Sequence, residues 1–302
     1  MINIEKNKTI KEHFVPQFYL KNFYHENEAF WVYDKYANKI FESNSYGVCF
    51  ENYLYETKGS GKLSDGKHIL PNLIEKKLAD VDAKNSIFIN NIIKRLSIQI
   101  SPNALILKSS EVEQLLDFID NLFIRHPDCM NSFLTEENYK KVLSNNPDVV
   151  DNIDELFEIL GFGDSEAFKK VSVKNMYFDS NGKGVSYKKY FKLMDYFFLK
   201  ASEGVLFTAD YPIRMDLNYD SQTFNSIYLP ISNEYAIVLV SQRSFNRNRL
   251  ITIDKATIDK LNKYVLFDSF NKKIITSNKE QIESILKSVK VQYTVLEKPK
   301  GN

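Results

Sequence analysis

The chain has 302 residues, 43% of them hydrophobic and 26% charged, with a formal net charge of +1 at pH 7. This balance is ordinary for a soluble globular protein of one large or two smaller domains, and it excludes a global basic field that would attract nucleic acid. Cys49 and Cys129 are far apart, and no apolar run reaches the roughly 20 residues of a membrane helix. We therefore predict a cytoplasmic protein without a disulfide scaffold, a Cys-type zinc site or a membrane span.

The stretch around Pro16 predicts a short helix near the N-terminus. Proline suits the first turn of a helix, where its missing N–H is not needed. Leu20, Phe23 and Tyr24 follow at helical spacing, so their side chains would share one face. His13 would then precede the helix, close to free backbone N–H groups that favour anions.

Strands are predicted to follow this helix. Residues 29–33 are rich in aromatic side chains and Val, residues 34–38 form a turn, and residues 39–41 return as a second strand. Strand-like sequence continues over residues 46–55. The N-terminal part of the fold, residues 12–56, is therefore expected to be one helix with strands.

The middle of the chain, residues 70–200, has mainly helical periodicity. In its clearest amphipathic helix, Ser109 or Ser110 can act as the N-cap, and Glu113 has the capping-box spacing from Ser110. We predict helices over residues 70–96, 111–124, 135–143, 153–160, 165–178 and 187–201.

Beyond residue 204 the apolar period changes to that of strands, with a hairpin turn at Ser232, Asn233 and Glu234. Asp254 or Thr252 can cap a helix that ends at about residue 270. We predict strands over residues 205–208, 226–231, 235–241, 273–276 and 291–296, and a further helix over residues 279–287.

Strands at both ends and helices in the middle predict an α+β fold, with one domain over residues 1–302. We expect the N-terminal strands to join the strands of residues 205–241 in a mixed or antiparallel sheet. A helical lobe from residues 70–200 would cover one face, and residues 204–296 would supply the C-terminal strands and helices. This joining would bring His13 and Glu51 near Asp210.

Seven short motifs follow one another along the chain: His13-x-x-Pro16-x-x-x-Leu20-x-x-Phe23, Trp31-Val32-Tyr33-Asp34-Lys35, Glu51-Asn52-x-Leu54-Tyr55, Ile74-Glu75-x-x-Leu78, Arg125-x-Pro127, Thr208-Ala209-Asp210-Tyr211-Pro212 and Leu229-Pro230-Ile231-Ser232. In this order they resemble the motifs of a microbial family, DUF4238. The resemblance spans roughly residues 12–240 and implies a shared fold unit, with no activity to carry over. The family tends to read Ser-Asp-Asn-Pro where this chain has Ala209-Asp210-Tyr211-Pro212, so a hydroxyl and an amide are missing beside Asp210.

His13 and Asp210 are the first candidates for chemistry. An imidazole can transfer protons or bind a metal near pH 7, although His13 can equally fix the start of its helix through a hydrogen bond. Asp210 ends a predicted strand in a tight Asp-Tyr-Pro turn, where a carboxylate can be catalytic or can cap its own turn.

Glu51, Glu75 and Asp210 are the candidate metal ligands. Converging carboxylates can hold Mg²⁺ or Mn²⁺, whereas an isolated Glu75 would only compensate a helix dipole. Arg125 follows an apolar helix and could clamp a phosphate with its planar fork. Its alternative role is structural, at the helix C-terminus or paired with a buried carboxylate such as Asp210.

The sequence contains no Gly-x-Ser-x-Gly, His-Glu-x-x-His or Gly-x-Gly-x-x-Gly motif. The remaining candidate residues are a histidine, several carboxylates and an arginine. Together they predict a metal-dependent phosphodiester hydrolase, a nuclease in a microbial antiviral-defence or mobile-element setting. His13, Arg125 and Asp210 would be catalytic, and Mg²⁺ or Mn²⁺ the only cofactor. The alternative is a non-catalytic sensor or partner-binding module whose polar residues are structural. Nucleic acid and a protein are the expected partners, and the substrate is left open.

Overall fold

The computed structural model describes residues 11–52, 54–55, 73–98, 104–133, 187–218, 223–241 and 247–289. The predicted elements at 135–143, 153–160, 165–178 and 291–296 lie outside these ranges. In the described part the chain has an α+β fold with antiparallel and mixed sheets, as predicted. Its contacts divide the chain into a first unit (residues 1–14, 50–83 and 124–186) and a second unit (residues 15–49, 84–123 and 187–302).

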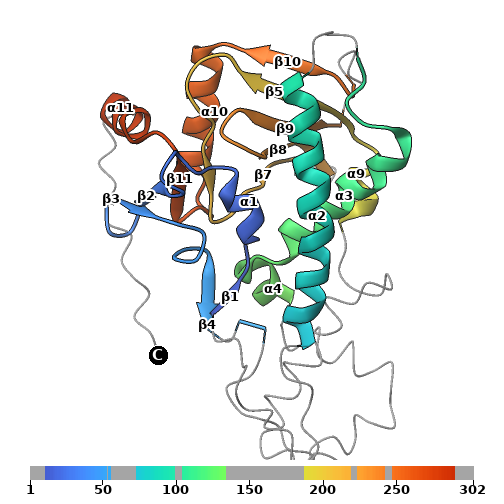
Figure 1. Ribbon diagram of the computed structural model, residues 1–302, viewed down its shortest axis with the longest axis horizontal. Coiled ribbons are helices and arrows are strands. Elements are labelled where there is room, and N and C mark those ends of the chain that lie inside the picture. Colours follow the sequence, from blue (N-terminus) through green and yellow to red (C-terminus); the bar gives the residue numbers. More distant parts are fainter. Residues whose placement is uncertain are drawn as a thin grey trace, which may run out of the picture. The chain divides into compact units, whose positions relative to one another are not determined.

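The larger sheet of the second unit is formed by β5 (Asp195–Ala201), β7 (Arg214–Asn218), β8 (Thr223–Pro230), β9 (Tyr235–Val240) and β10 (Leu250–Ile253). Their order is β10-β5-β9-β8-β7 (Figure 1). All neighbours are antiparallel except β10 and β5, which run parallel. The predicted hairpin at Ser232 is confirmed, because the Ser232 hydroxyl accepts the N–H groups of Glu234 and Tyr235 between β8 and β9.

The smaller sheet of the second unit is formed by β2 (Phe30–Asp34), β3 (Lys39–Ser43), β6 (Thr208–Ala209) and β11 (Lys273–Thr276). Its order is β3-β2-β11-β6, and every pair is antiparallel. The predicted hairpin of β2 and β3 is confirmed. Asp34 shapes its turn by accepting the N–H groups of Tyr36 and Ala37.

The expected joining of the N-terminal strands to residues 205–241 is therefore wrong for most of that region. Of the strands described in that region, only β6 belongs to the sheet of the N-terminal hairpin, and β7, β8 and β9 lie in the larger sheet. The hairpin instead pairs with β11, near the C-terminal end of the described chain. Local apolar spacing predicts that a segment is a strand but does not encode which strand it pairs with.

The helix predicted over residues 187–201 is also wrong. A single helical turn, α9 (Lys188–Phe191), precedes strand β5, which lies between β10 and β9. Aromatic residues such as Phe191, Phe197 and Phe198 satisfy a helical period, but a central strand that is apolar on both faces gives a similar run. Tyr196 and Phe198 are buried at alternate positions of β5, as expected of a strand.

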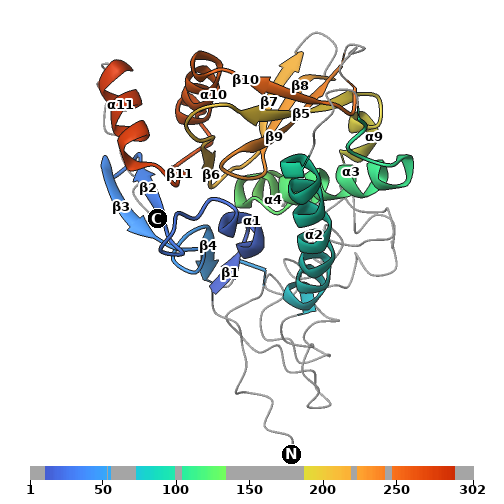
Figure 2. The ribbon, with the colours of Figure 1, turned by 45° about the horizontal axis from the view of Figure 1, so that its top comes forward.

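Two helices complete the core of the second unit, α10 (Lys255–Phe267) and α11 (Lys279–Val289) (Figure 2). Asp254 caps α10 by accepting the Thr257 N–H, as predicted. Ile258 of α10 and Ile282 of α11 are fully buried in one apolar cluster with side chains from both sheets. Removal of this apolar surface from water is the main force that holds these layers together.

The remaining described helices of the second unit are α1 (Gln17–Lys21), the later part of α2 (Leu73–Ile98) and nearly all of α3 (Ser109–Ile124). The capping-box role at α3 belongs to Glu111, which accepts the Lys108 N–H, and not to Glu113 as predicted. Among the described residues, the helices are too short or too polar to span a membrane.

Tyr19 of α1 links the two sheets of the second unit. Its buried hydroxyl donates to the Pro230 carbonyl of β8 at 2.6 Å and lies 2.7 Å from the Thr208 hydroxyl of β6. Because the phenol has one proton, the Thr208 hydroxyl is the donor in the second bond. Burial raises the pKa of Tyr19, partly opposed by the Thr208 hydrogen bond, so this link stays protonated at physiological pH.

The first unit contains β1 (Lys11–His13), β4 (Phe50–Asn52), the start of α2 and α4 (Pro127–Phe133). β1 and β4 form a two-stranded antiparallel sheet in which Glu12 is opposite Glu51 and His13 is opposite Phe50. The strand-like stretch predicted over residues 46–55 is thus a strand only at residues 50–52 of its described part.

Candidate functional site

Arg125 is the centre of a buried polar network in the first unit. Its residue exposure is 2%, and its Nη1 donates to Asp82 Oδ1 of α2 at 2.6 Å. Its Nη2 donates to the backbone carbonyl of His13 at 3.1 Å. The guanidinium therefore connects α2 to strand β1 by a salt bridge on one side and a backbone contact on the other.

Glu12 and Tyr55 form the second part of this network. We call the contacts among His13, Arg125, Asp82, Glu12 and Tyr55 the His13–Arg125 network. Glu12 is fully buried, and its Oε2 accepts the Tyr55 N–H at 2.6 Å. The Tyr55 hydroxyl lies 3.4 Å from the His13 carbonyl, which it reaches as a donor, and it also hydrogen-bonds Arg125. These contacts hold the segment after β4 against β1.

The charges around Tyr55 are arranged to keep Arg125 protonated. Burial disfavours the charged guanidinium, but Asp82 and Tyr55 more than offset this and raise the pKa of Arg125. Burial raises the pKa of Tyr55, while Arg125 opposes that rise and Glu75 and Asp82 add to it. The network thus contains the neutral Tyr55 phenol and the Arg125 cation, both close to carboxylates of α2.

The other candidates of the first unit lie around this network. The His13 ring centroid is 5.6 Å from that of Phe50 on the neighbouring strand. Glu75 acts on Tyr55 electrostatically, so it is close to the network. Glu51 is exposed on β4, next to Phe50 in sequence. The structure therefore brings His13, Glu75 and Arg125 into one region and leaves Glu51 on the surface.

Asp210 belongs to the second unit, where it directly follows β6. Its exposure is 3%, and its Oδ1 accepts the backbone N–H groups of Lys272 and Lys273 at 2.9 and 3.1 Å. Burial raises the pKa of Asp210, against the opposing effect of those two N–H groups and of the nearby lysine charges. Asp210 thus ties the residues after β6 to the start of β11.

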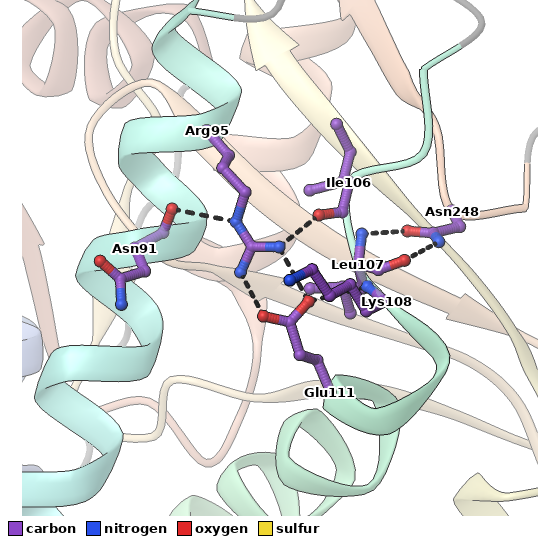
Figure 3. Close-up of polar contacts among 7 residues, drawn as sticks. All are labelled: Asn91, Arg95, Ile106, Leu107, Lys108, Glu111 and Asn248. Atoms are coloured by element: carbon purple, nitrogen blue, oxygen red, sulfur yellow. Dashed lines mark hydrogen bonds and ion pairs between the residues drawn. The ribbon is translucent and has the colours of Figure 1, made fainter.

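A pocket of about 950 Å³ lies elsewhere in the second unit. Figure 3 shows part of its wall, where Arg95 of α2 reaches Glu111 of α3 and the Ile106 carbonyl. The described residues contain no group of three or more His, Cys, Asp or Glu side chains that could hold a metal ion. The metal role of Glu51, Glu75 and Asp210 stays a prediction.

The profile of a protein family described as a protein of unknown function, DUF4238, matches residues 11–280. The chain belongs to DUF4238. The match covers most of the sequence and confirms the resemblance predicted from the motifs. Comparison of this DUF4238 chain with curated proteins gives no match, and comparison with solved structures gives none either.

Sequence reasoning missed several polar residues of this DUF4238 chain. Glu12 was not a candidate, because a glutamate is rarely buried, and Asp82 reads as one more charge on a helix. The partner of Arg125 among the described residues is Asp82, and not Asp210 as one interpretation suggested. The amphipathic helix predicted over residues 111–124 was a usable signal, because Arg125 follows it directly and would be carried toward the interior.

Proposed function

We propose that this protein is a non-catalytic binding module, a sensor or a partner-binding component, in which His13, Arg125 and Asp210 hold the fold. The observation that carries the proposal is the environment of Arg125. The guanidinium is buried, paired with Asp82 and bonded to the His13 carbonyl. A side chain that clamps a substrate phosphate needs donors that face an open site, whereas these donors point at the protein itself.

Asp210 supports the same interpretation independently. Its Oδ1 accepts two backbone N–H groups, and its exposure is 3%. A buried acceptor in this position removes the cost of two unsatisfied amides. A carboxylate that binds a divalent cation would instead present oxygens toward the other ligands.

A metal-dependent phosphodiester hydrolase is the second candidate. One observation favours it: Glu75 and Asp82, seven residues apart on α2, both act on the Tyr55 hydroxyl. Two carboxylates on one side of a helix could supply oxygen ligands for Mg²⁺ or Mn²⁺. DNA or RNA would be the substrate under this hypothesis.

Thermal unfolding of three variants and one control variant separates the two candidates. Arg125→Lys keeps the charge but loses the planar fork of donors, and His13→Ala and Asp210→Ala remove the other two side chains. Under the binding-module proposal, Arg125→Lys lowers stability by about 3 kcal/mol, as expected for a broken buried pair. Asp210→Ala also lowers the Tm. Mn²⁺ shifts no Tm, and the wild type cleaves neither DNA nor RNA.

Glu51→Gln is the matched control, because Glu51 is an exposed member of the expected metal site. The binding-module proposal expects no change in its Tm. The hydrolase expects Mn²⁺-dependent cleavage by the wild type, loss of cleavage in Glu51→Gln and an unchanged Tm. Cleavage by the wild type that His13→Ala and Asp210→Ala abolish at unchanged Tm would overturn the binding-module proposal.

A further inference from the structure

The pocket of the second unit is lined by segments that are distant in sequence. Arg95 comes from the end of α2, the stretch before α3 forms one wall, and Arg247 and Asn248 come from the stretch before β10. Its volume of about 950 Å³ is within the range of small-molecule sites. It shares no residue with the His13–Arg125 network.

The floor of the pocket is apolar. Leu107, Leu116 and Tyr196 line it and are buried, and Val112 is half-buried. Leu105, at its edge, has 68% of its surface exposed. An apolar or planar group bound here would cover surface that the protein leaves in contact with water.

The rim of the pocket is positively charged. Four cationic side chains line it, Arg95, Lys108, Lys192 and Arg247, with Glu113 as the one lining carboxylate. Glu111 and Asp195 pair with the arginines from just outside the lining. Counting all three carboxylates, one positive charge remains in excess. The rim therefore favours an anion.

Lys108, Lys192 and Arg247 can reorient toward a ligand without breaking a strong salt bridge. Lys108 is exposed, and its charge helps to lower the pKa of Glu111. Arg247 Nε is 3.5 Å from Asp195, and Lys192 Nζ is 3.2 Å from Glu113. The Arg247 and Lys192 side chains are 62% and 52% exposed, and solvent weakens pairs of exposed side chains. Asp195 is 16% exposed, and Arg247 also lies 6.0 Å from the Tyr196 ring centroid, so Arg247 gives up more than Lys192 when it turns. Glu113 would keep a second partner, because Lys188 Nζ lies 2.5 Å away.

The fixed part of the wall is held by two buried or half-buried contacts. Asn248 pairs with both backbone groups of Leu107, at 2.8 and 2.7 Å. Arg95 donates to the Ile106 carbonyl at 2.7 Å and to both carboxylate oxygens of Glu111 (Figure 3). A site with a rigid wall and adjustable charges binds without much loss of conformational entropy.

We propose that this pocket binds an organic phosphate of nucleotide size. Its apolar or planar body would lie against Leu105, Val112 and Tyr196, and its phosphate would be shared by Lys108, Lys192 and Arg247. Failure of this proposal leaves the role of Arg125 untouched, because the two sites have no residue in common.

Calorimetric titration of the full chain with ATP tests the proposal. We expect saturable binding that weakens as NaCl is added, because salt screens exposed charges. Lys108→Glu and Arg247→Glu should each weaken ATP binding about five- to tenfold. Val112→Trp keeps every charge and fills the floor, so it should weaken ATP binding as well. Inorganic phosphate and adenosine should each bind more weakly than ATP.

Lys255→Glu is the matched control, because Lys255 is an exposed lysine of α10 that does not line the pocket. It should leave ATP affinity unchanged, and the Tm of each variant checks its folding. Absence of ATP binding at millimolar concentration would overturn the proposal. So would equal affinity in Lys108→Glu, Arg247→Glu and Lys255→Glu, binding of adenosine as tight as that of ATP, or binding of single-stranded RNA without binding of ATP.

Discussion

Arg95 and Glu111 form a two-point salt bridge between α2 and α3, with Nη1 2.8 Å from Oε2 and Nη2 2.7 Å from Oε1. Glu111 Oε2 also accepts the N–H of Lys108, the residue before α3. One carboxylate therefore joins two helices and satisfies a backbone donor at a helix start. Parallel bonds of this kind are stronger than those of an ordinary surface pair.

Glu111→Gln should lower stability by about 1 kcal/mol at pH 7. Hydrogen bonds from Arg95, together with the Lys108 N–H, hold the pKa of Glu111 below its ordinary value of 4.5, against the opposing effect of burial. A lowered folded-state pKa gives stability that is present above 4.5 and is lost as pH falls through the folded value. The gap between wild type and Glu111→Gln should thus shrink below pH 4.5, measured by urea unfolding.

Glu203→Gln is the control for this pH dependence, since Glu203 is exposed in the turn after β5. Its stability should match that of the wild type across the same pH range. A gap between wild type and Glu111→Gln that is constant from pH 7 to pH 4 would contradict the role assigned to Glu111.

Asp210→Asn and Asp210→Ala should have opposite consequences. The raised pKa of Asp210 means that burial penalises its charge, so its contribution to stability is greatest below 3.8 and declines as pH rises through the folded value. An amide oxygen can accept the same two N–H groups without that charge. We expect Asp210→Asn to equal or exceed the wild type at pH 7, and Asp210→Ala to lose about 1–3 kcal/mol, by chemical unfolding. Equal loss in both variants would show that the charge itself is needed.

Asn262→Ala should be costly, because Asn262 is fully buried and acts on the backbone before β6. Its Oδ1 accepts the Phe207 N–H at 2.8 Å, and its Nδ2 donates to the Val205 carbonyl at 2.8 Å. Each backbone group that is left without a hydrogen bond should lower the free energy of unfolding by about 1–3 kcal/mol. Gln281 of α11 donates to the same carbonyl at 3.1 Å, so the double variant with Gln281→Ala should lose more than the sum of the single losses. Strict additivity in chemical unfolding would argue against the shared acceptor.

Asn248→Ala should destabilise more than Asn248→Gly. Asn248 has a φ of 56°, in the left-handed region, and its side chain pairs with both backbone groups of Leu107. Both variants lose these bonds, but alanine keeps a Cβ in that conformation, whereas glycine removes it and relieves about 1 kcal/mol of strain. Unfolding midpoints that rank the glycine variant below the alanine variant would contradict this explanation.

Much of the fold could be predicted from local pattern. The amphipathic spacing at 111–124 corresponds to α3 (Ser109–Ile124), and β8, β9, α10, β11 and α11 lie close to their predicted ranges. The prediction failed at β5, where a run of aromatic residues fits both a helical and a strand period. It also omitted β10, because Thr252 was interpreted as a possible N-cap of the following helix. Pairing partners could not be predicted from apolar spacing, because β2 and β11 are far apart in sequence and meet only in the folded protein.

The candidate site was less predictable than the fold. Arg125 was identified because a cation directly after an apolar helix has to be explained. Its partner Asp82 carries no spacing signal, since the two residues meet only after α2 and the segment beyond α3 are in place. The pocket proposed to bind an organic phosphate was not predicted either. Its cations are scattered from residue 95 to residue 247, and each looks like an ordinary surface charge in sequence.

The late position of β11 in the sequence means that β2 is synthesised long before the strand that pairs with it. On the ribosome, β2 and β3 emerge early, but the strand that must pair with β2 is made only after residue 272. A lone hairpin is marginally stable in water. A nascent chain stalled before that point would display the unsatisfied edge of β2 and the apolar side chains of Phe30 and Val32, which invite aggregation. The hairpin gains its pairing partner in this sheet only when β11 has been synthesised.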